Sequence, residues 1–307
     1  MQTPFNYIYT NTDISIRYGI WHPGNKKPTG SVILLGGRGE FMEKYAETIA
    51  ELNQRGYSVY SLDWRGQGLS TRMLQNRTKG HVDKYEDYIN DLDVFIRNIV
   101  TPEALSPIIL LAHSMGAHIA LRYIHDRPGV IERAVLTAPM IDILTTPSLR
   151  GPAEFITRVL TGTGMGHVYT LGSGDFSPSR VKFEGNRLTS DPERFMDASR
   201  AIADNPDLAI GGVTYGWLSA TFDSIGILKK PGYAGEIKTP VLIVSAGEDR
   251  IVSIDAQKEI CALMPDCTFR LIENARHEIV KECDAIRSIF WKEFDAFVGR
   301  SKPLHGI

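Results

Sequence analysis

Short apolar runs rich in β-branched residues alternate with longer amphipathic stretches along most of this chain. Such alternation is typical of a mostly parallel sheet that is covered by helices on both faces. The runs predict central strands over residues 31–37, 57–63, 107–113, 133–139, 240–247 and 267–273. Apolar residues at three- and four-residue spacing predict crossover helices over residues 42–56, 85–100 and 254–264. Residues 5–10 and 14–21 predict an antiparallel hairpin at one edge of the sheet.

The alternation stops after Pro139, and a stretch of about 95 residues follows without any strand-like run. It carries glycine-rich segments and short helical pieces such as residues 151–160 and 191–204. A doubly wound sheet does not normally contain so long an interruption, so we expect an inserted helical cap. The predicted fold is therefore α/β, with a core formed by residues 1–139 and 236–307 and a cap formed by residues 140–235.

Composition and charge exclude several classes of protein. The formal net charge of −2 leaves no basic stripe that would bind nucleic acid. The first residues lack the pattern of a signal peptide, and no apolar run approaches the roughly 18 residues of a membrane-spanning helix. Cys261, Cys267 and Cys283 make an odd count without the spacing of metal ligands. We therefore expect a cytoplasmic protein in a reducing compartment, with no metal site.

The segment LAHSMGAH, residues 111–118, places Ser114 where a predicted strand turns into a helix. Ala112 and Gly116 flank the serine at two positions on either side, which gives the pattern A-x-S-x-G. This pattern is one methyl group away from the nucleophile elbow of serine hydrolases, in which small residues are needed because strand and helix crowd the turn. Taken alone, the serine is interpreted equally well as a helix cap.

A serine nucleophile needs a base and an acid, which follow in the order Ser, Asp or Glu, His in folds of this type. Asp249 follows the predicted strand 240–247, and His277 follows the strand 267–273. The carboxyl ends of parallel strands meet at one edge of the sheet, so the order and the location agree. Two alternatives stay open for the acid, because Glu248 is a rival and Asp249 also suits the cap of the next helix.

An oxyanion hole is commonly built from the amide after the nucleophile and an amide in the loop after an early strand. Met115 supplies the first amide by its position, and Arg38 in the segment GGRGE, residues 36–40, can supply the second. A glycine-rich turn after a strand also binds phosphate. This segment, however, lacks both a G-x-G-x-x-G fingerprint and a Walker lysine.

Six stretches, in this order, resemble the monoacylglycerol lipase and lysophospholipase branch of the α/β-hydrolases, and bacterial lysophospholipases in particular. They are GGRGEFMEKYAE, GYSVYSLDWRGQGLS, GHVDKYEDYINDL, AHSMGAH, AGEDRIV and ARHEIVKE. The resemblance covers nearly the whole chain. It implies an α/β-hydrolase fold, with Ser114 as nucleophile, Asp249 as acid, His277 as base, and the Arg38 and Met115 amides as oxyanion donors. The chain departs from the family pattern at Gly36, where the lipases commonly have histidine, and at Ala112, where they have glycine.

We therefore expect a serine carboxylester hydrolase that cleaves the acyl ester of a single-chain lipid, a lysophospholipid or a monoacylglycerol, through an acyl-enzyme. No metal or organic cofactor is implied. The expected wall of the acyl pocket consists of Phe155, Leu160, Trp217 and Phe222. Transient contact of the cap with a membrane surface is compatible with this function, while the sequence leaves the oligomeric state open.

Two other functions remain as alternatives. A serine aminopeptidase of the proline-iminopeptidase kind shares the fold and the triad, but needs a carboxylate in the cap to hold a free amine. Glu154, Glu184 and Glu193 are the candidates for that carboxylate. The second alternative is an inactive hydrolase relic that serves as a binding module, although such relics usually lack a triad member and this chain has all three.

Overall fold

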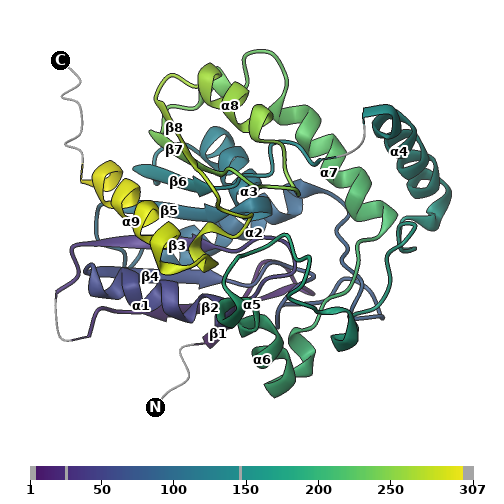
Figure 1. The fold of residues 1–307 in the computed structure, drawn as a ribbon, viewed down its shortest axis with the longest axis horizontal. Coiled ribbons are helices and arrows are strands. Elements are labelled where there is room, and N and C mark those ends of the chain that lie inside the picture. Colours follow the sequence, from purple (N-terminus) through teal and green to yellow (C-terminus); the bar gives the residue numbers. More distant parts are fainter. Residues whose placement is uncertain (1–4, 25–26, 145–146, 300–307) are drawn as a thin grey trace.

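The computed structural model describes residues 5–24, 27–144 and 147–299. In these residues, eight strands form one sheet in the order β1-β2-β4-β3-β5-β6-β7-β8 (Figure 1). The strands are β1 (Phe5–Tyr9), β2 (Ser15–Trp21), β3 (Gly30–Leu35), β4 (Tyr57–Leu62), β5 (Ile108–His113), β6 (Arg133–Thr137), β7 (Val241–Ala246) and β8 (Cys267–Ile272). β1 and β2 form an antiparallel hairpin that joins β4, and all neighbours from β4 to β8 are parallel. This arrangement confirms the predicted sheet and its edge hairpin.

Burial on both faces explains why the inner strands have continuous apolar runs. Every residue of β3, β6 and β7 is buried. The prediction of a central strand was wrong for β8, which is the edge of the sheet and pairs only with β7. Its Leu271 is 42% exposed, because no further strand covers that edge.

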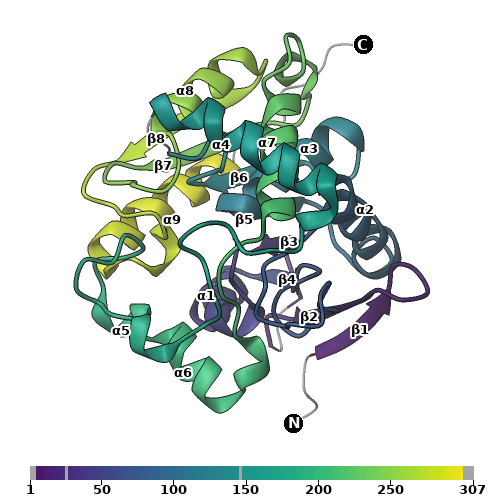
Figure 2. The same cartoon turned by 90° about the vertical axis from the view of Figure 1, so that its right-hand side faces the viewer.

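The helices cover both faces of the sheet (Figure 2). On one face, α1 and α9 pack against side chains of β3, β5 and β7, whereas α2, α3 and α8 pack against the other face. The predicted helix over residues 42–56 begins as a 3₁₀ turn, and the predicted helix over residues 85–100 ends in a π-helical turn. The helices are α1 (Ala46–Gln54), α2 (Tyr85–Phe95), α3 (Ser114–Asp126), α4 (Pro147–Leu160), α5 (Pro192–Phe195), α6 (Asp197–Asp204), α7 (Tyr215–Leu228), α8 (Ile254–Leu263) and α9 (Asp284–Val298).

The chain between β6 and β7 contains α4 to α7, and its described residues form no strand. Helix α7 is fastened to the core helices α2 and α3 by buried hydrogen bonds. The Tyr85 hydroxyl lies 3.0 Å from Thr221 Oγ1, and His118 Nε2 lies 2.6 Å from Ser224 Oγ. This insertion corresponds to the predicted cap, whose division from the core at residues 140 and 235 remains a prediction.

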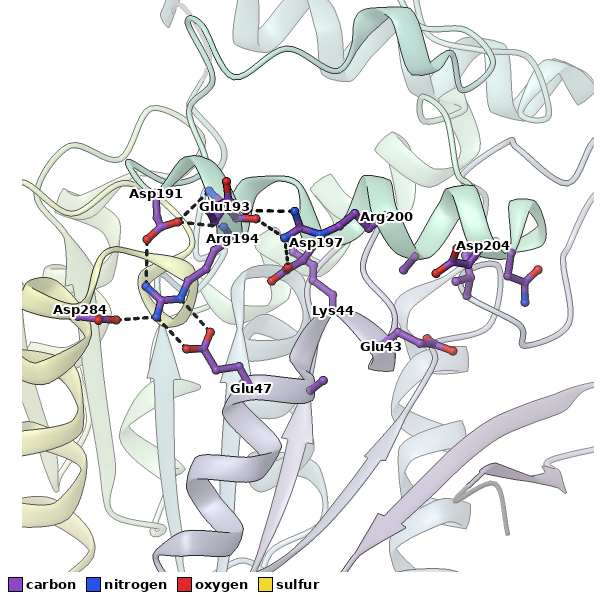
Figure 3. A pocket seen from close by; sticks show the side chains of 14 residues that line it. Glu43, Lys44, Glu47, Asp191, Glu193, Arg194, Asp197, Arg200, Asp204 and Asp284 are labelled. Atoms are coloured by element: carbon purple, nitrogen blue, oxygen red, sulfur yellow. Dashed lines mark hydrogen bonds and ion pairs between the residues drawn. The ribbon is translucent and has the colours of Figure 1, made fainter. Parts of the chain in front are cut away.

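The short helices α5 and α6 of the insertion lie beside α1 and α9, where a charged network holds them (Figure 3). The Arg194 guanidinium donates to Glu47 of α1 at 2.7 Å and to Asp284 of α9 at 2.5 Å. The Lys281 ammonium donates to Asp197 of α6 at 2.5 Å. The pocket at this junction, here called the acidic pocket, is lined by seven acidic and three basic residues.

Two observations bear on the expected location of the protein. In the described part of the chain, no helix is long and apolar enough to cross a membrane. Cys261 at the end of α8 and Cys267 at the start of β8 form a disulfide, and Cys283 is free. Disulfides are rare in reducing compartments, so the odd cysteine count does not support the cytoplasmic setting that we inferred from it. The cytoplasmic location remains a prediction, and the cysteine count no longer supports it.

Candidate active site

Ser114 is the first residue of α3 and follows directly on β5. Its φ angle of 51° lies in the left-handed region, a strained conformation that raises the side chain above the end of the sheet. Gly116 explains why the turn needs small residues, because a Cβ atom there would lie 2.4 Å from the carbonyl oxygen of Gly36. Helix α3 can therefore pack against the loop after β3 only with glycine at this position. Ala112 is fully buried in β5, where the sheet accommodates its methyl group.

The three predicted triad residues meet at the carboxyl ends of β5, β7 and β8. The Nε2 atom of His277 lies 2.9 Å from Ser114 Oγ, and its Nδ1 atom lies 2.7 Å from Asp249 Oδ2. The other oxygen of Asp249 accepts hydrogen bonds from the amides of Ile251 and Val252, at 2.8 and 3.1 Å. With the carboxylate fixed by these amides, Nδ1 donates to Asp249 and Nε2 is left to accept the serine proton.

The surroundings of Asp249 stabilise a charged carboxylate, whereas its rival Glu248 lies exposed to solvent. Burial raises the pKa of the Asp249 carboxyl, but hydrogen bonds from His277 and from the two amides outweigh it and leave the pKa below its usual value. Asp249 is therefore ionised at neutral pH. Glu248 is exposed, and the structure gives its side chain no bond to the imidazole.

The loop after β3 passes directly beside the serine. A Cβ atom on Gly37 would lie 3.2 Å from Ser114 Cβ and 3.1 Å from His113 Cδ2. Among the backbone hydrogen bonds formed outside the helices and strands of the described ranges, none has the Arg38 amide as donor. The Arg38 amide and the amide of Met115, the residue after Ser114, stay the predicted oxyanion donors.

A buried polar network supports this loop, and we did not predict it from the sequence. The Glu40 carboxylate accepts hydrogen bonds from the Gly37 amide, from the Tyr45 hydroxyl at 2.5 Å and from the Lys44 ammonium at 2.7 Å. Lys44 also donates to Glu278, the neighbour of the triad histidine, at 2.6 Å. The signal lay in the sequence as an i, i+4 pair of opposite charges within GEFMEK.

The charges of this network are fixed by their mutual contacts. Burial raises the pKa of the Glu40 carboxyl, but the Lys44 ammonium overcomes this effect and holds the pKa well below its usual range. Burial lowers the pKa of Lys44, whereas Glu278 and Glu40 together raise it above its usual value. Both groups therefore stay charged at neutral pH, in direct contact with the loop.

Two further histidines flank the serine in sequence. Burial lowers the pKa of His113 and of His118 to about 4, so both rings are neutral at pH 7. The ring of His113 lies 4.7 Å from that of His277, between centroids. His118 instead faces the insertion, where its Nδ1 atom lies 2.8 Å from the carbonyl oxygen of Met140.

Two pockets adjoin each other near the site, and one of them borders the loop after β3. The first, here called the loop pocket, measures about 280 Å³ and is bounded by Arg38, Gly39, Glu40 and Glu278 on the core side. The second, here called the apolar pocket, measures about 500 Å³ and is lined mainly by apolar side chains of the insertion. Both pockets are lined by Phe176, Val181, Ser199 and Ile202.

The four residues expected to form the acyl wall do not line either pocket. Phe155 is 69% exposed on the outer side of α4, which also carries the half-buried Leu160. Trp217 is buried beneath the Arg38 guanidinium, 5.9 Å from the ring centroid, and Phe222 is buried beneath Arg150. The role of these four residues as the wall of an acyl pocket stays a prediction.

Comparisons with known proteins show the family of this chain. The profile of the Hydrolase_4 family, described as serine aminopeptidase, S33, matches residues 26–284. A probable lysophospholipase L2 of Haemophilus influenzae is 31% identical over 297 residues, which cover 97% of this chain and 92% of the relative. Lysophospholipase L2 of Escherichia coli K12 is 33% identical over 287 residues, 90% of this chain and 82% of the relative.

Solved structures show the same fold. A soluble variant of monoglyceride lipase from Saccharomyces cerevisiae, in complex with a substrate analog, superimposes with a TM-score of 0.75 at 21% identity. The superposition covers 97% of this chain and 96% of that one. The chain is an α/β-hydrolase and belongs to the Hydrolase_4 family, within the branch that contains the lysophospholipases L2 and the monoglyceride lipases.

Proposed function

We propose that this protein is a serine carboxylester hydrolase that removes the single acyl chain of a lysophospholipid or a monoacylglycerol. The observation that carries the proposal is the continuous line of hydrogen bonds from Ser114 through His277 to Asp249. The relatives named lysophospholipase L2 support the lipid substrate, since they match over most of the chain. No cofactor is required by this chemistry.

The reaction follows from the positions of these groups. Ser114 Oγ attacks the ester carbonyl while His277 Nε2 takes its proton, and the ionised Asp249 stabilises the imidazolium that forms. The Arg38 and Met115 amides receive the oxygen of the tetrahedral intermediate. His277 then protonates the departing alcohol, and a water molecule, activated by the same imidazole, releases the fatty acid from Ser114.

The apolar pocket suits the acyl chain of the substrate. It adjoins the loop pocket, whose lining includes Arg38. The residue before Arg38, Gly37, lies against Ser114. Burial of an acyl chain there stabilises the complex by about 0.8 kcal/mol for each methylene group that is removed from water. Affinity for the substrate is therefore expected to grow with chain length until the pocket is full.

The three carboxylates that we expected to anchor the free amine of an aminopeptidase substrate do not line the loop pocket. Glu154 is paired with Arg150 at 2.5 Å, and Glu193 is bonded to Arg200 at 3.4 Å and lines the acidic pocket. Glu184 lies among three basic residues of the insertion. The carboxylates that do reach the loop pocket, Glu40 and Glu278, are both bound to Lys44.

Helix α4 offers a face for contact with lipid aggregates. Phe155, Ile156 and Val159 are 69%, 48% and 45% exposed, and their spacing within α4 places them on one face of the helix. An exposed apolar group of this kind suits the surface of a membrane or micelle, where the lipid substrate of the protein is concentrated.

Phe155→Ser with Ile156→Ser is expected to weaken sedimentation with phospholipid vesicles and leave hydrolysis of monomeric esters unchanged. Equal sedimentation of both proteins would contradict this contact. The cytoplasmic location of the protein remains a proposal.

A labelling experiment combined with a substrate panel tests the proposed function. A fluorophosphonate probe is expected to modify Ser114, identified by peptide mass spectrometry, and prior modification is expected to abolish hydrolysis. The panel compares lysophospholipids, monoacylglycerols, short p-nitrophenyl esters and aminoacyl amides. The proposal predicts hydrolysis of the two lipid classes with little action on amides. Preferential cleavage of aminoacyl amides would favour the peptidase, and a protein that is neither labelled nor active would be a binding module.

A further inference from the structure

The insertion carries a group of exposed cations next to the site. Arg180, Lys182 and Arg187 line a pocket of about 560 Å³, together with a single acidic residue, Glu184. All three basic side chains are exposed. None of them forms an ion pair with a residue in the described part of the chain, so their charges are available to a ligand. This group is here called the basic pocket.

Backbone contacts fix the basic pocket beside the triad. The amide of His277 donates to the carbonyl oxygen of Arg187 at 3.4 Å, and the amide of Glu278 donates to that of Leu188 at 2.8 Å. The segment that carries Arg187 therefore runs along the segment that carries the triad histidine. The basic pocket and the loop pocket also share Val181, Leu188 and Phe195 as lining residues.

The loop pocket thus has two neighbours of opposite character. The apolar pocket adjoins it through Phe176 and Ile202, and the basic pocket adjoins it through Leu188 and Phe195. A molecule with one apolar chain and one anionic end matches this arrangement. In a lysophospholipid, only the three carbons of glycerol separate the acyl ester from the phosphate, so a phosphate site must adjoin the ester site.

Acidic and basic residues lie on different sides of α5, so only one side can attract a phosphate. The acidic pocket of Figure 3 lies on the side of α5 that faces α1 and α9, and carries seven acidic residues. It shares only Lys44 with the loop pocket, and Lys44 is already bound by two carboxylates. An anionic head group is repelled on that side and attracted towards Arg180, Lys182 and Arg187.

We propose that the basic pocket binds the phosphate of a lysophospholipid head group while the ester lies at Ser114. This inference rests on the proposed function and makes it more specific, because it predicts a preference for phosphorylated over unphosphorylated single-chain lipids. Arginine and lysine are the side chains that most often bind phosphate, through charge-assisted hydrogen bonds. The glycerophosphate then leaves on the side where the basic pocket adjoins the loop pocket.

A matched substrate pair tests the site. 1-Acylglycerol 3-phosphate and 1-acylglycerol with the same acyl chain differ only in the phosphate, and both are used below the critical micelle concentration. The triple variant Arg180→Gln, Lys182→Gln, Arg187→Gln is expected to lower kcat/KM for the phosphorylated lipid about ten- to hundredfold. Its kcat/KM for 1-acylglycerol is expected to stay within about twofold, which also shows that the variant is folded.

A control variant separates local binding from the general loss of positive charge. Lys238→Gln, Lys258→Gln and Lys292→Gln remove the same charge from exposed positions that line none of these pockets. This control is expected to keep the wild-type ratio of kcat/KM between the two lipids. An equal loss in both triple variants would overturn the site, since it would show only long-range attraction.

The basic pocket could instead bind free inorganic phosphate. Kinetics in the presence of inorganic phosphate distinguish this ligand from a head group. If the pocket receives a head group, inorganic phosphate is expected to compete with 1-acylglycerol 3-phosphate and to leave 1-acylglycerol hydrolysis unchanged. A change in 1-acylglycerol hydrolysis by phosphate, lost in the Arg180 triple variant, would instead show an effector site and overturn the proposal. Equal kinetics of wild type and that variant on both lipids would also overturn it. If the wild-type protein hydrolysed neither ester, this result would contradict the proposed function and not the phosphate site.

Discussion

The Nε2 atom of His277 lies 2.9 Å from the Oγ atom of Ser114, although 163 residues separate the two in the chain. Because the two groups act as one unit, Ser114→Ala and His277→Ala are each expected to lower kcat by roughly six orders of magnitude. The variants are compared on a monomeric ester after each has been shown to keep the wild-type circular dichroism. A Ser114→Ala protein with appreciable esterase activity would contradict the nucleophile assignment.

Substitutions at two neighbouring carboxylates, Asp249 and Glu248, test which of them is the acid of the triad. Asp249→Asn is expected to lower kcat by about four orders of magnitude, because the amide no longer holds the imidazole in the productive tautomer. Glu248 is exposed and makes no bond to His277, so Glu248→Gln is expected to keep most of the wild-type kcat. Similar losses in the two variants would require the acid role to be shared or reassigned.

Glu40 is expected to act as a positioning residue, since its carboxylate holds the Gly37 amide next to the serine. Glu40→Gln cannot accept from Gly37, Tyr45 and Lys44 together, so the oxyanion loop shifts and kcat falls about ten- to hundredfold at nearly constant KM. Glu103→Gln, at an exposed carboxylate beyond the opposite end of the sheet, is the matched control. A rise in KM at unchanged kcat would place the role of Glu40 in ground-state binding instead.

His118 makes the stability depend on pH. Burial lowers its pKa from 6.5 to about 4 in the folded protein, so between these values the unfolded chain takes up a proton that the folded chain does not. The free energy of unfolding is therefore highest above pH 6.5 and falls by up to about 1.4 kcal/mol per pH unit towards pH 4 through this one group. In His118→Gln this part of the slope is expected to disappear in urea unfolding at several pH values. An unchanged slope would show that His118 is not the titrating group.

The core strands and the triad were predictable for the same physical reason. β3, β6 and β7 are buried on both faces, which requires continuous apolar runs that stand out in the sequence. In a parallel sheet the residues after such runs meet at one edge, so Asp249 and His277 could be placed near Ser114 without coordinates. A single run does not tell a central strand from an edge strand, and this is why β8 was misplaced.

The pockets were not predictable, because contacts between distant residues position α5 and α6. Arg194 binds Glu47, which is 147 residues away in the chain, and no local pattern indicates this pair. Tertiary packing buries Trp217 under Arg38 and leaves Phe155 exposed, a difference that the apolar character of the two residues does not indicate. The Cys261–Cys267 disulfide was missed for a similar reason, since an odd count does not reveal which cysteines pair.

A pair of variants on one helix tests where the acyl chain lies. Ala203 of α6 lines the apolar pocket, whereas Ala201 of the same helix lines the acidic pocket. Ala203→Trp is expected to fill part of the apolar pocket and to shorten the acyl chain with the highest kcat/KM. Ala201→Trp is the matched control and is expected to keep the wild-type optimum. If both variants kept that optimum, the acyl chain would have to lie outside the apolar pocket.

The central claim is hydrolysis of single-chain lipid esters at Ser114, and the dependence of kcat/KM on acyl length tests it most directly. The wild-type protein is assayed on 1-acylglycerols of increasing chain length, each below its critical micelle concentration, with aminoacyl amides in parallel. At about 0.8 kcal/mol per buried methylene, kcat/KM is predicted to rise roughly fourfold with each carbon until the pocket is full, with no cleavage of the amides. A flat dependence on acyl length, together with cleavage of aminoacyl amides, would contradict the account.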